Sequence, residues 1–344
     1  MSPRVHGRRG DDFDDDDLSV FERRSGYSRP RTKDRPDYSA SAIGRVLGVD
    51  RGRFEVLLPG DTAASGGRSV RAMKARALGR KGVIVGDLVR LSGDVSGTAG
   101  TLARIAQVSE RVTVLRRTAD DDDPFERPIV ANADQLLIVT ALADPPPRPG
   151  MIDRILVAAY DARIAPVLCL TKADLASPDD LSAQYASLGV PIVSIHPGSN
   201  LDELRSLLRE HFTVFVGHSG VGKSTLINAL IPGANRVIGD VNESTGKGRH
   251  TSTSAVALPL PANAGWVIDT PGVRSFGLSH VSVASVLGAF PDLAEIATRC
   301  PKGCTHAATA PGCALNDAVS AGVLGEIRLT SLRRILTTLV ENHP

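Results

Sequence analysis

The stretch "VFVGHSGVGKSTLINAL" at residues 214–230 joins an apolar run, a glycine-rich turn and a helical pattern. Gly217, Gly222, Lys223 and Ser224 fit the pattern G-x-x-x-x-G-K-[ST], and the strand-like and helix-like flanks are the context that this pattern requires. In such a loop, backbone N–H groups converge on phosphate oxygens at the start of a helix. The stretch therefore predicts an α/β domain with a phosphate-binding loop.

Each part of this loop has an expected contact with the nucleotide. The Lys223 ammonium neutralises charge on the β and γ phosphates, which makes it a candidate catalytic residue, and the Ser224 hydroxyl ligates Mg²⁺. The predicted phosphate contacts are Gly217, His218, Ser219, Gly220, Val221, Gly222, Lys223, Ser224 and Thr225.

Two downstream stretches are typical of sensors for the third phosphate. "WVIDTPG" at 266–272 places Asp269 at the end of an apolar run, where it holds the Mg²⁺ shell through water, and Gly272 where its N–H faces the γ-phosphate. The polar segment "NESTGKGRHTSTSA" at 242–255 suits a switch whose threonine ligates Mg²⁺ only when that phosphate is present. We select Thr251 as the ligand, with Thr253 as the alternative.

Base choice is predicted from "LCLTKAD" at 168–174. Asp174, at the end of this apolar run, can accept two hydrogen bonds from guanine N1–H and the exocyclic amine, and adenine offers no such donor pair. Lys172 is expected to lie across the nucleotide, and Thr171 stands where asparagine is usual. Ser194, within the predicted strand end "IVSIH" at 192–196, is a candidate neighbour of the base oxygen, although a serine there is also a common turn former. GTP is the predicted nucleotide.

The order of these motifs is unusual, because the base-reading motif precedes the phosphate loop. A circular permutation explains this order, since it moves the chain ends while the parallel sheet keeps its ligand crevice at the carboxyl ends of the strands. Apolar runs alternating with helical stretches predict such a sheet, with helices on both faces, in a domain at 119–278. The segment after Asp269 leads directly into the C-terminal region, so we expect nucleotide state to reposition that region.

The region before this domain is basic and rich in short strand patterns. Residues 39–118 hold 14 Lys and Arg against 6 Asp and Glu, which favours a polyanion partner, with a merely solvated surface as the alternative. Five predicted strands, at 42–49, 53–58, 82–91, 100–108 and 111–117, indicate a small all-β barrel. The basic excess favours an oligonucleotide-binding (OB) type that contacts RNA, and an SH3-like barrel remains the alternative.

The two ends of the chain differ from the middle. Residues 1–38, with six Asp between 11 and 17 followed by scattered arginines, are predicted to form a disordered charged tail. Residues 279–344 read as a helical domain with the spacing C-x3-C-x-H-x6-C, which predicts one structural Zn²⁺ site, with chance clustering as the alternative. The four predicted zinc ligands are Cys300, Cys304, His306 and Cys313.

Composition and apolar runs indicate the number of domains and the cellular compartment. The chain has 344 residues and 42% hydrophobic residues, which is enough for two or three packed domains. The sequence shows neither an apolar run of about 18 residues nor the hydrophobic segment of a signal peptide, so we expect a cytoplasmic protein without membrane contact. Its four cysteines then serve as thiols or metal ligands, and Cys169 reads as a core residue.

Taken with their order, these motifs resemble the circularly permuted, ribosome small-subunit-dependent GTPases of the RsgA (YjeQ) family. The matching segments, across about residues 40–340, include "VGDLVRL", "ANADQLLIV", "TKADL", "GHSGVGKSTLIN", "GKGRHTST", "DTPGVRSFGL" and "CTHAATAPGCAL". The resemblance implies an OB-type barrel, a permuted GTPase domain, a zinc domain, and action late in small-subunit assembly with subunit-stimulated hydrolysis. The first cysteine gap is one residue shorter than in the family pattern, and the tail lies outside the match.

The catalytic water has no obvious partner in the sequence. Val273 stands where Ras-like enzymes keep a water-positioning glutamine, so intrinsic hydrolysis should be slow. His250 in the switch segment is the candidate by position and by resemblance, and a structural or RNA-contacting role is the alternative.

Two functions remain open on this reading. The first is a monomeric GTPase that binds the small ribosomal subunit and its rRNA, hydrolyses GTP to GDP, and so times its own release. The second is a GTP-dependent binding switch in which hydrolysis is incidental. A kinase or ATPase is disfavoured by the base-reading motif.

Overall fold

The computed structural model describes residues 37–60, 67–79, 82–118, 126–234, 255–270, 276, 278 and 281–340. Its contacts group residues 40–344 into one unit, apart from residues 1–39. Residues 1–36 of the predicted tail therefore lie outside the described residues. So do three predicted site residues, His250, Thr251 and Gly272.

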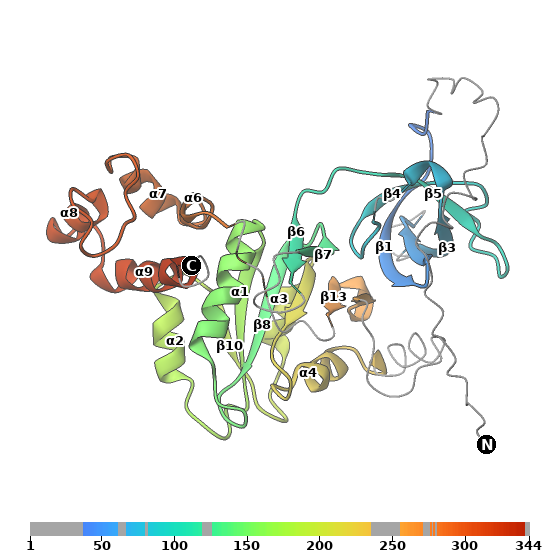
Figure 1. Cartoon of the computed structure of the whole chain (residues 1–344). Helices are drawn as coiled ribbons and strands as arrows, with labels where there is room; N and C mark the ends of the chain where they lie inside the picture. The colour runs from blue at the N-terminus through green and yellow to red at the C-terminus, as the bar shows by residue number, and fades with distance from the viewer. Residues whose placement is uncertain are drawn as a thin grey trace, which may run out of the picture. The chain divides into compact units, whose positions relative to one another are not determined.

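The first part of the larger unit is a five-stranded barrel (Figure 1). Its strands are β1 (Ile43–Asp50), β2 (Arg53–Leu58), β3 (Arg68–Lys74), β4 (Leu88–Ser92) and β5 (Ala103–Val108), with a 3-10 turn at Arg76–Leu78. They pair in the order β1-β2-β3-β5-β4, and β4 closes back onto β1. Only the β3–β5 pair is parallel. This arrangement confirms the OB-type barrel over the SH3-like alternative.

Side-chain alternation explains the barrel. Phe54 and Val56 of β2 face its core while Arg53 and Glu55 face outward, as period-two strands require. A Cβ on Gly44 would lie 2.5 Å from Val56 Cγ1, so β1 needs glycine where it crosses β2.

The strand assignment for this barrel needs one correction. The fifth barrel strand was expected at 111–117, but β6 (Val114–Arg117) instead pairs with β7 (Arg127–Ala131) in a separate two-stranded sheet. The barrel strand that the sequence pattern did not predict is β3, whose sequence "RSVRAMK" buries only Val70 and Ala72. A stretch with three basic residues and only two buried apolar ones carries little apolar signal, which is why the sequence pattern missed it.

The central domain is built on a parallel sheet. Its strands are β8 (Gln135–Ala141), β9 (Ala165–Thr171), β10 (Ile192–Ser194), β11 (Phe212–Val216) and β13 (Trp266–Asp269), and β12 (Val256–Pro259) runs antiparallel to β13. The spatial order is β10-β9-β8-β11-β13-β12. The phosphate-loop strand β11 therefore sits in the middle of the sheet although it is fourth along the chain. This order confirms the permuted GTPase arrangement.

Helices cover both faces of this sheet. Alternate residues of β8 enter different cores, with Leu136 and Ile138 on one side and Leu137 and Val139 on the other. The first side is covered by α1 (Pro149–Asp161) and α2 (Asp179–Ala186), and the second by α3 (Asp202–Leu208) and α4 (Lys223–Leu230). A 3-10 turn at Pro261–Asn263 joins β12 to β13.

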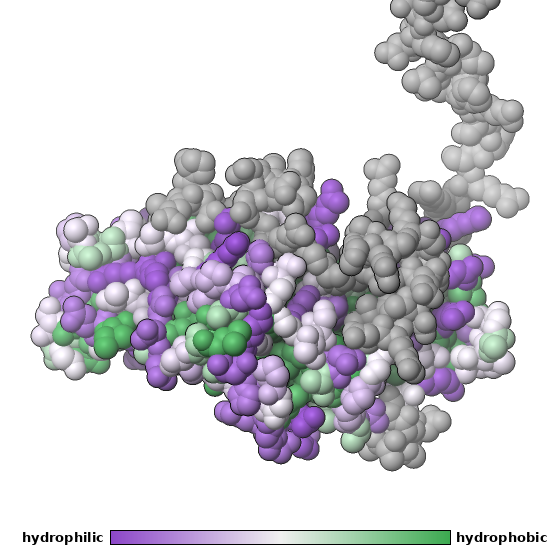
Figure 2. All heavy atoms as spheres, turned by 90° about the horizontal axis from the view of Figure 1, so that it is seen from below, coloured by the Kyte–Doolittle hydropathy of each residue, from purple (hydrophilic) through white to green (hydrophobic). Residues whose placement is uncertain are grey.

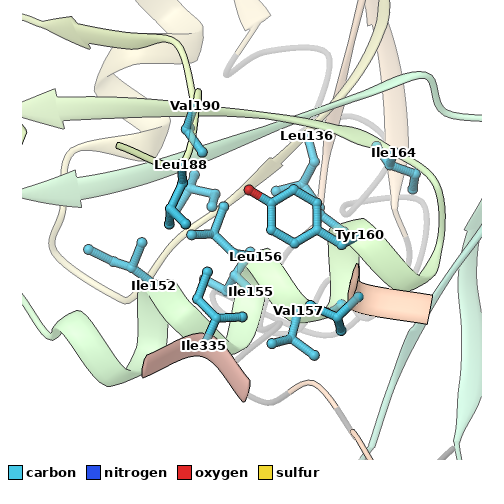
Figure 3. Close-up of a cluster of buried hydrophobic side chains, with 14 of the residues drawn as sticks. Leu136, Ile152, Ile155, Leu156, Val157, Tyr160, Ile164, Leu188, Val190 and Ile335 are labelled. Carbon is cyan, nitrogen blue, oxygen red and sulfur yellow. The ribbon is translucent and has the colours of Figure 1, made fainter. Parts of the chain in front are cut away.

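The C-terminal part is helical and packs against α1. It contains α6 (Val283–Leu287), α7 (Pro291–Ala297), α8 (Ala314–Ser320) and α9 (Glu326–Val340). Ile335 of α9 lies in the same buried cluster as Ile152 and Ile155 of α1 (Figure 3). Beside them, Arg334 forms a 3.0 Å ion pair with the buried Asp153. Burial raises the pKa of Asp153 while Arg334 opposes that rise, so the carboxylate depends on its partner from α9.

The described surface mixes residue types. Hydrophilic and hydrophobic residues are interspersed over the face shown in Figure 2. Among the described residues, the helices are all too short or too polar to cross a membrane.

Candidate nucleotide site and metal centre

The phosphate loop lies between the end of β11 at Val216 and the start of α4 at Lys223. A Cβ on Gly217 would lie 2.4 Å from the Val139 carbonyl oxygen, so only glycine lets β11 leave the sheet here. Gly220 and Gly222 have φ angles of 82° and 90°, the left-handed region that glycine enters without strain. The loop therefore has the backbone that its sequence predicts.

The loop meets the second predicted motif through Lys223. Its Nζ donates to Asp269 Oδ1 at 2.9 Å and to the Thr270 carbonyl at 3.2 Å. The two charged side chains keep 15% and 12% of their surface exposed, so the pair is little screened by solvent. Thr270 Oγ1 in turn donates to the Phe215 carbonyl at 2.8 Å, which ties the end of β13 to β11.

The predicted base-reading residues follow neighbouring strands at the same edge of the sheet. β9 and β10 pair in parallel, with Ser194 in register with Leu170. Asp174, beyond the end of β9, and Ser194, the last residue of β10, are both exposed. The Lys172 ammonium donates a hydrogen bond to the Asp144 carbonyl. The side chains predicted to bind one nucleotide thus lie along one rim, as the carboxyl ends of parallel strands require.

Thr171, a predicted GTP-binding residue, is the buried last residue of β9. It is 5% exposed, and its hydroxyl lies 2.6 Å from the Val221 carbonyl of the phosphate loop and 3.2 Å from the Thr140 carbonyl. The hydroxyl therefore ties the base-reading strand to the phosphate loop.

Sequence reasoning missed the loop between β8 and α1. Arg148 Nη1 lies 3.4 Å from His218 Nε2, and a Cβ on Gly220 would meet Pro145 Cδ at 3.6 Å. With the Lys172 bond to Asp144, these contacts bring the proline-rich stretch "DPPPRPG" against the phosphate loop. The proline run marks a loop in the sequence, but nothing in the pattern shows which neighbour it meets.

The four predicted metal ligands come together in the C-terminal domain. One ligand atom from each of Cys300, Cys304, His306 and Cys313 lies within 4.8 Å of all the others. His306 Nδ1 is 3.7 Å from Cys300 Sγ and 3.9 Å from Cys313 Sγ. Tetrahedral bonds of about 2.3 Å to sulfur and about 2.0 Å to nitrogen would put such a pair about 3.6 Å apart, so the donor set fits zinc.

Neighbouring groups orient these ligands. The Ala314 N–H donates to Cys300 Sγ at 3.3 Å, and Arg333 Nε donates to the His306 carbonyl at 2.8 Å. Burial and then the Arg333 charge lower the pKa of His306, which favours the neutral imidazole that ligates metals. Four protein ligands leave no open position, so the set suits a structural ion.

Comparisons with known proteins agree with this geometry. The family model described as RsgA GTPase matches residues 108–279. A protein of Ectopseudomonas mendocina is 43% identical over 225 residues, which cover 63% of this chain and 65% of the relative. One of Pseudomonas aeruginosa strain LESB58 is 40% identical over 255 residues, 72% of this chain and 74% of the relative. Both relatives are named small ribosomal subunit biogenesis GTPase RsgA.

Two solved structures share the fold. YjeQ from Thermotoga maritima superposes with a TM-score of 0.64 at 25% identity, over 87% of this chain and 98% of that protein. YloQ, described as a circularly permuted GTPase, gives a TM-score of 0.63 at 23% identity, over 91% of this chain and 99% of that protein.

Proposed function

Since the chain belongs to the RsgA GTPase family, we propose that it binds the small ribosomal subunit and its rRNA and hydrolyses GTP to GDP and phosphate. Hydrolysis would time its release late in subunit maturation. The observation that carries this proposal is the 2.9 Å pair between Lys223 and Asp269, which joins the phosphate loop to the strand end that is predicted to sense the third phosphate.

The nucleotide would lie along the rim described above. Lys223 binds its β and γ phosphates, and Asp174 accepts two hydrogen bonds from guanine. Ser224, at the start of α4, would hold Mg²⁺ with Thr251, and the ion would neutralise phosphate charge. His250 is proposed to position the attacking water, and Gly272 to donate its N–H to the γ-phosphate. His250, Thr251 and Gly272 lie outside the described residues.

The other parts of the chain would serve attachment. We propose three domains at 39–118, 119–278 and 279–344, with the barrel on rRNA phosphates and one structural Zn²⁺ in the last domain. The protein would act as a monomer in the cytoplasm.

The test of this proposal is GTP turnover with and without purified small subunits. We expect stimulation of at least about 100-fold, because a family member without a water-positioning glutamine hydrolyses GTP slowly on its own. The His250→Ala variant should keep its GTP affinity and lose most of the stimulation. Nucleotide-dependent binding without any stimulation would instead identify a switch in which hydrolysis is incidental.

The preference for guanine that we assign to Asp174 gives a second prediction. In Asp174→Asn, one carboxylate acceptor becomes an amide donor, so guanine loses a hydrogen bond and meets an unpaired N–H. We expect GTP affinity to fall about 100-fold. Xanthosine triphosphate should bind the variant better than the wild type, because its 2-oxo group accepts from that amide. Competition binding with both nucleotides measures the exchange, and unchanged GTP preference would contradict the assignment of Asp174.

A further inference from the structure

The side chain of His218, the second residue of the phosphate loop, faces the loop between β8 and α1. It lines a small cavity behind the phosphate loop together with Pro145, Arg148 and Val221. The other walls of this cavity come from the end of β8 and from α1, the helix that covers this face of the sheet. The imidazole is therefore placed to act on the backbone of the phosphate loop from behind.

The hydrogen bonds of the His218 ring indicate which of its nitrogens carries the proton. Nε2 lies 3.4 Å from Arg148 Nη1, and a guanidinium has only donors, so Nε2 must accept. Nδ1 lies 2.9 Å from the Ser219 carbonyl oxygen, which can only accept, so Nδ1 must donate. A single state of the ring satisfies both contacts, the imidazole with its proton on Nδ1 alone. Arg148 therefore selects the tautomer that holds the Ser219 carbonyl.

The Ser219 carbonyl belongs to the same peptide plane as the N–H of Gly220. This peptide is trans, so its N–H points opposite to its C=O. A carbonyl held toward His218 behind the loop thus turns the Gly220 N–H toward the inside of the loop, where phosphate oxygens are expected. Gly220 has a φ of 82° and no Cβ, so its own side chain does little to fix this plane. The hydrogen bond from His218 supplies that restraint.

The loop that carries Arg148 is itself held against the phosphate loop. A Cβ on Gly220 would meet Pro145 Cδ at 3.6 Å, and the Asp144 carbonyl accepts from the Lys172 ammonium. Arg148 immediately precedes α1, which is largely buried from its fourth residue onward. The guanidinium therefore reaches His218 from a backbone that is anchored on both sides.

We propose that His218 and Arg148 are positioning residues for GTP hydrolysis. Arg148 selects the tautomer of His218, and His218 in turn aims the Gly220 N–H at the phosphates before GTP binds. A donor that is oriented in advance needs no reorganisation when charge grows on the phosphates during the reaction. This inference rests on the proposed function and adds two residues that act on the nucleotide through the backbone of the phosphate loop.

The test compares two variants that have the same shape. In His218→Asn the side-chain amide places an N–H where Nδ1 stood and can still donate to Ser219, whereas the side chain of His218→Leu has the same outline and no donor. We expect His218→Leu to lower both the kcat/KM for GTP and the affinity for a non-hydrolysable GTP analogue about 5- to 10-fold, the bias that one ordinary hydrogen bond gives. His218→Asn should recover both values to within about 2-fold of the wild type.

Arg148 acts only through His218, so the effects of the two residues must be coupled. Arg148→Met alone should cost about 3-fold in kcat/KM. The same change in the His218→Asn background should cost nothing further, because an amide has no tautomer to select. The matched control is Arg163→Met, which removes an exposed guanidinium beyond the other end of α1 and should behave like the wild type. Thermal melts show whether each variant is equally folded.

The Gly220 amide gives a spectroscopic signature of the same effect. In protein labelled with 15N-glycine, its proton resonance should move downfield when the wild type or His218→Asn binds the analogue, and less in His218→Leu. Equal kcat/KM in the Leu and Asn variants, or an undiminished effect of Arg148→Met in the Asn background, would overturn the proposal. A wild type that hydrolyses GTP without any response to small subunits would instead contradict the proposed function and leave this comparison intact.

Discussion

Replacing Lys223 by methionine should lower the kcat/KM for GTP by about 1,000-fold, the largest effect that we expect from one substitution in the nucleotide site. The ammonium is the positive charge on the phosphate loop that faces Asp269, and we expect it to neutralise charge that grows between the β and γ phosphates during hydrolysis. Methionine keeps the apolar stem and removes the charge. Single-turnover assays at saturating GTP separate the loss of chemistry from the loss of binding.

The control must address folding, because the largely buried Asp269 carboxylate would lose its partner. A thermal melt of Lys223→Met against the wild type measures that cost directly. Lys223→Arg retains the charge but cannot place a compact ammonium between two phosphates, so its kcat should remain far below that of the wild type. Near wild-type turnover in a folded Lys223→Met would remove Lys223 from the catalytic residues.

The sequence was most informative where chemistry restricts residue choice. The phosphate loop needs glycine at Gly217 and at Gly222 because of a close carbonyl and a left-handed turn, so its motif predicts its backbone. The order of motifs then predicts the strand order, since the carboxyl ends of parallel strands must share one crevice. The gathering of the four candidate metal ligands was also predictable, because their spacing is local.

Contacts between distant segments were not predictable in the same way. Arg148 contacts His218, which lies 70 residues further along the chain, and no sequence motif links the two residues. Arg334 is one of several arginines on a helical pattern, and its ion pair with Asp153 follows only from the packing of α9 against α1. Strand β3 was missed because two small apolar residues supply its buried face. In each case tertiary packing decides the structure, and local sequence carries little of that information.

The cluster of three cysteines and His306 supports the second large effect. Cys313, 1% exposed, precedes α8 directly, and Ala314 and Leu315 of that helix enter the domain core. Between Cys300 and Cys313 the chain forms turns without a helix or strand, so this part of the domain has few other contacts to order it. Zinc binding in such small domains contributes about 10 kcal/mol or more to folding. We therefore expect Cys313→Ser to lose the ion and to unfold the segment from 300 to 320.

This unfolding should stay local, which makes the prediction sharp. Helix α9 buries Leu332 and Ile335 against α1 and holds Asp153 through Arg334, and these contacts do not use the metal. Hydrogen exchange should thus lose protection across α8 while α9 and β11 keep theirs, and metal analysis should fall from one zinc per chain to none. Cys169→Ala, which removes a buried thiol from β9 instead, should retain the zinc and the protection of α8. Full protection of α8 in a metal-free Cys313→Ser protein would show that the helices alone fold this domain.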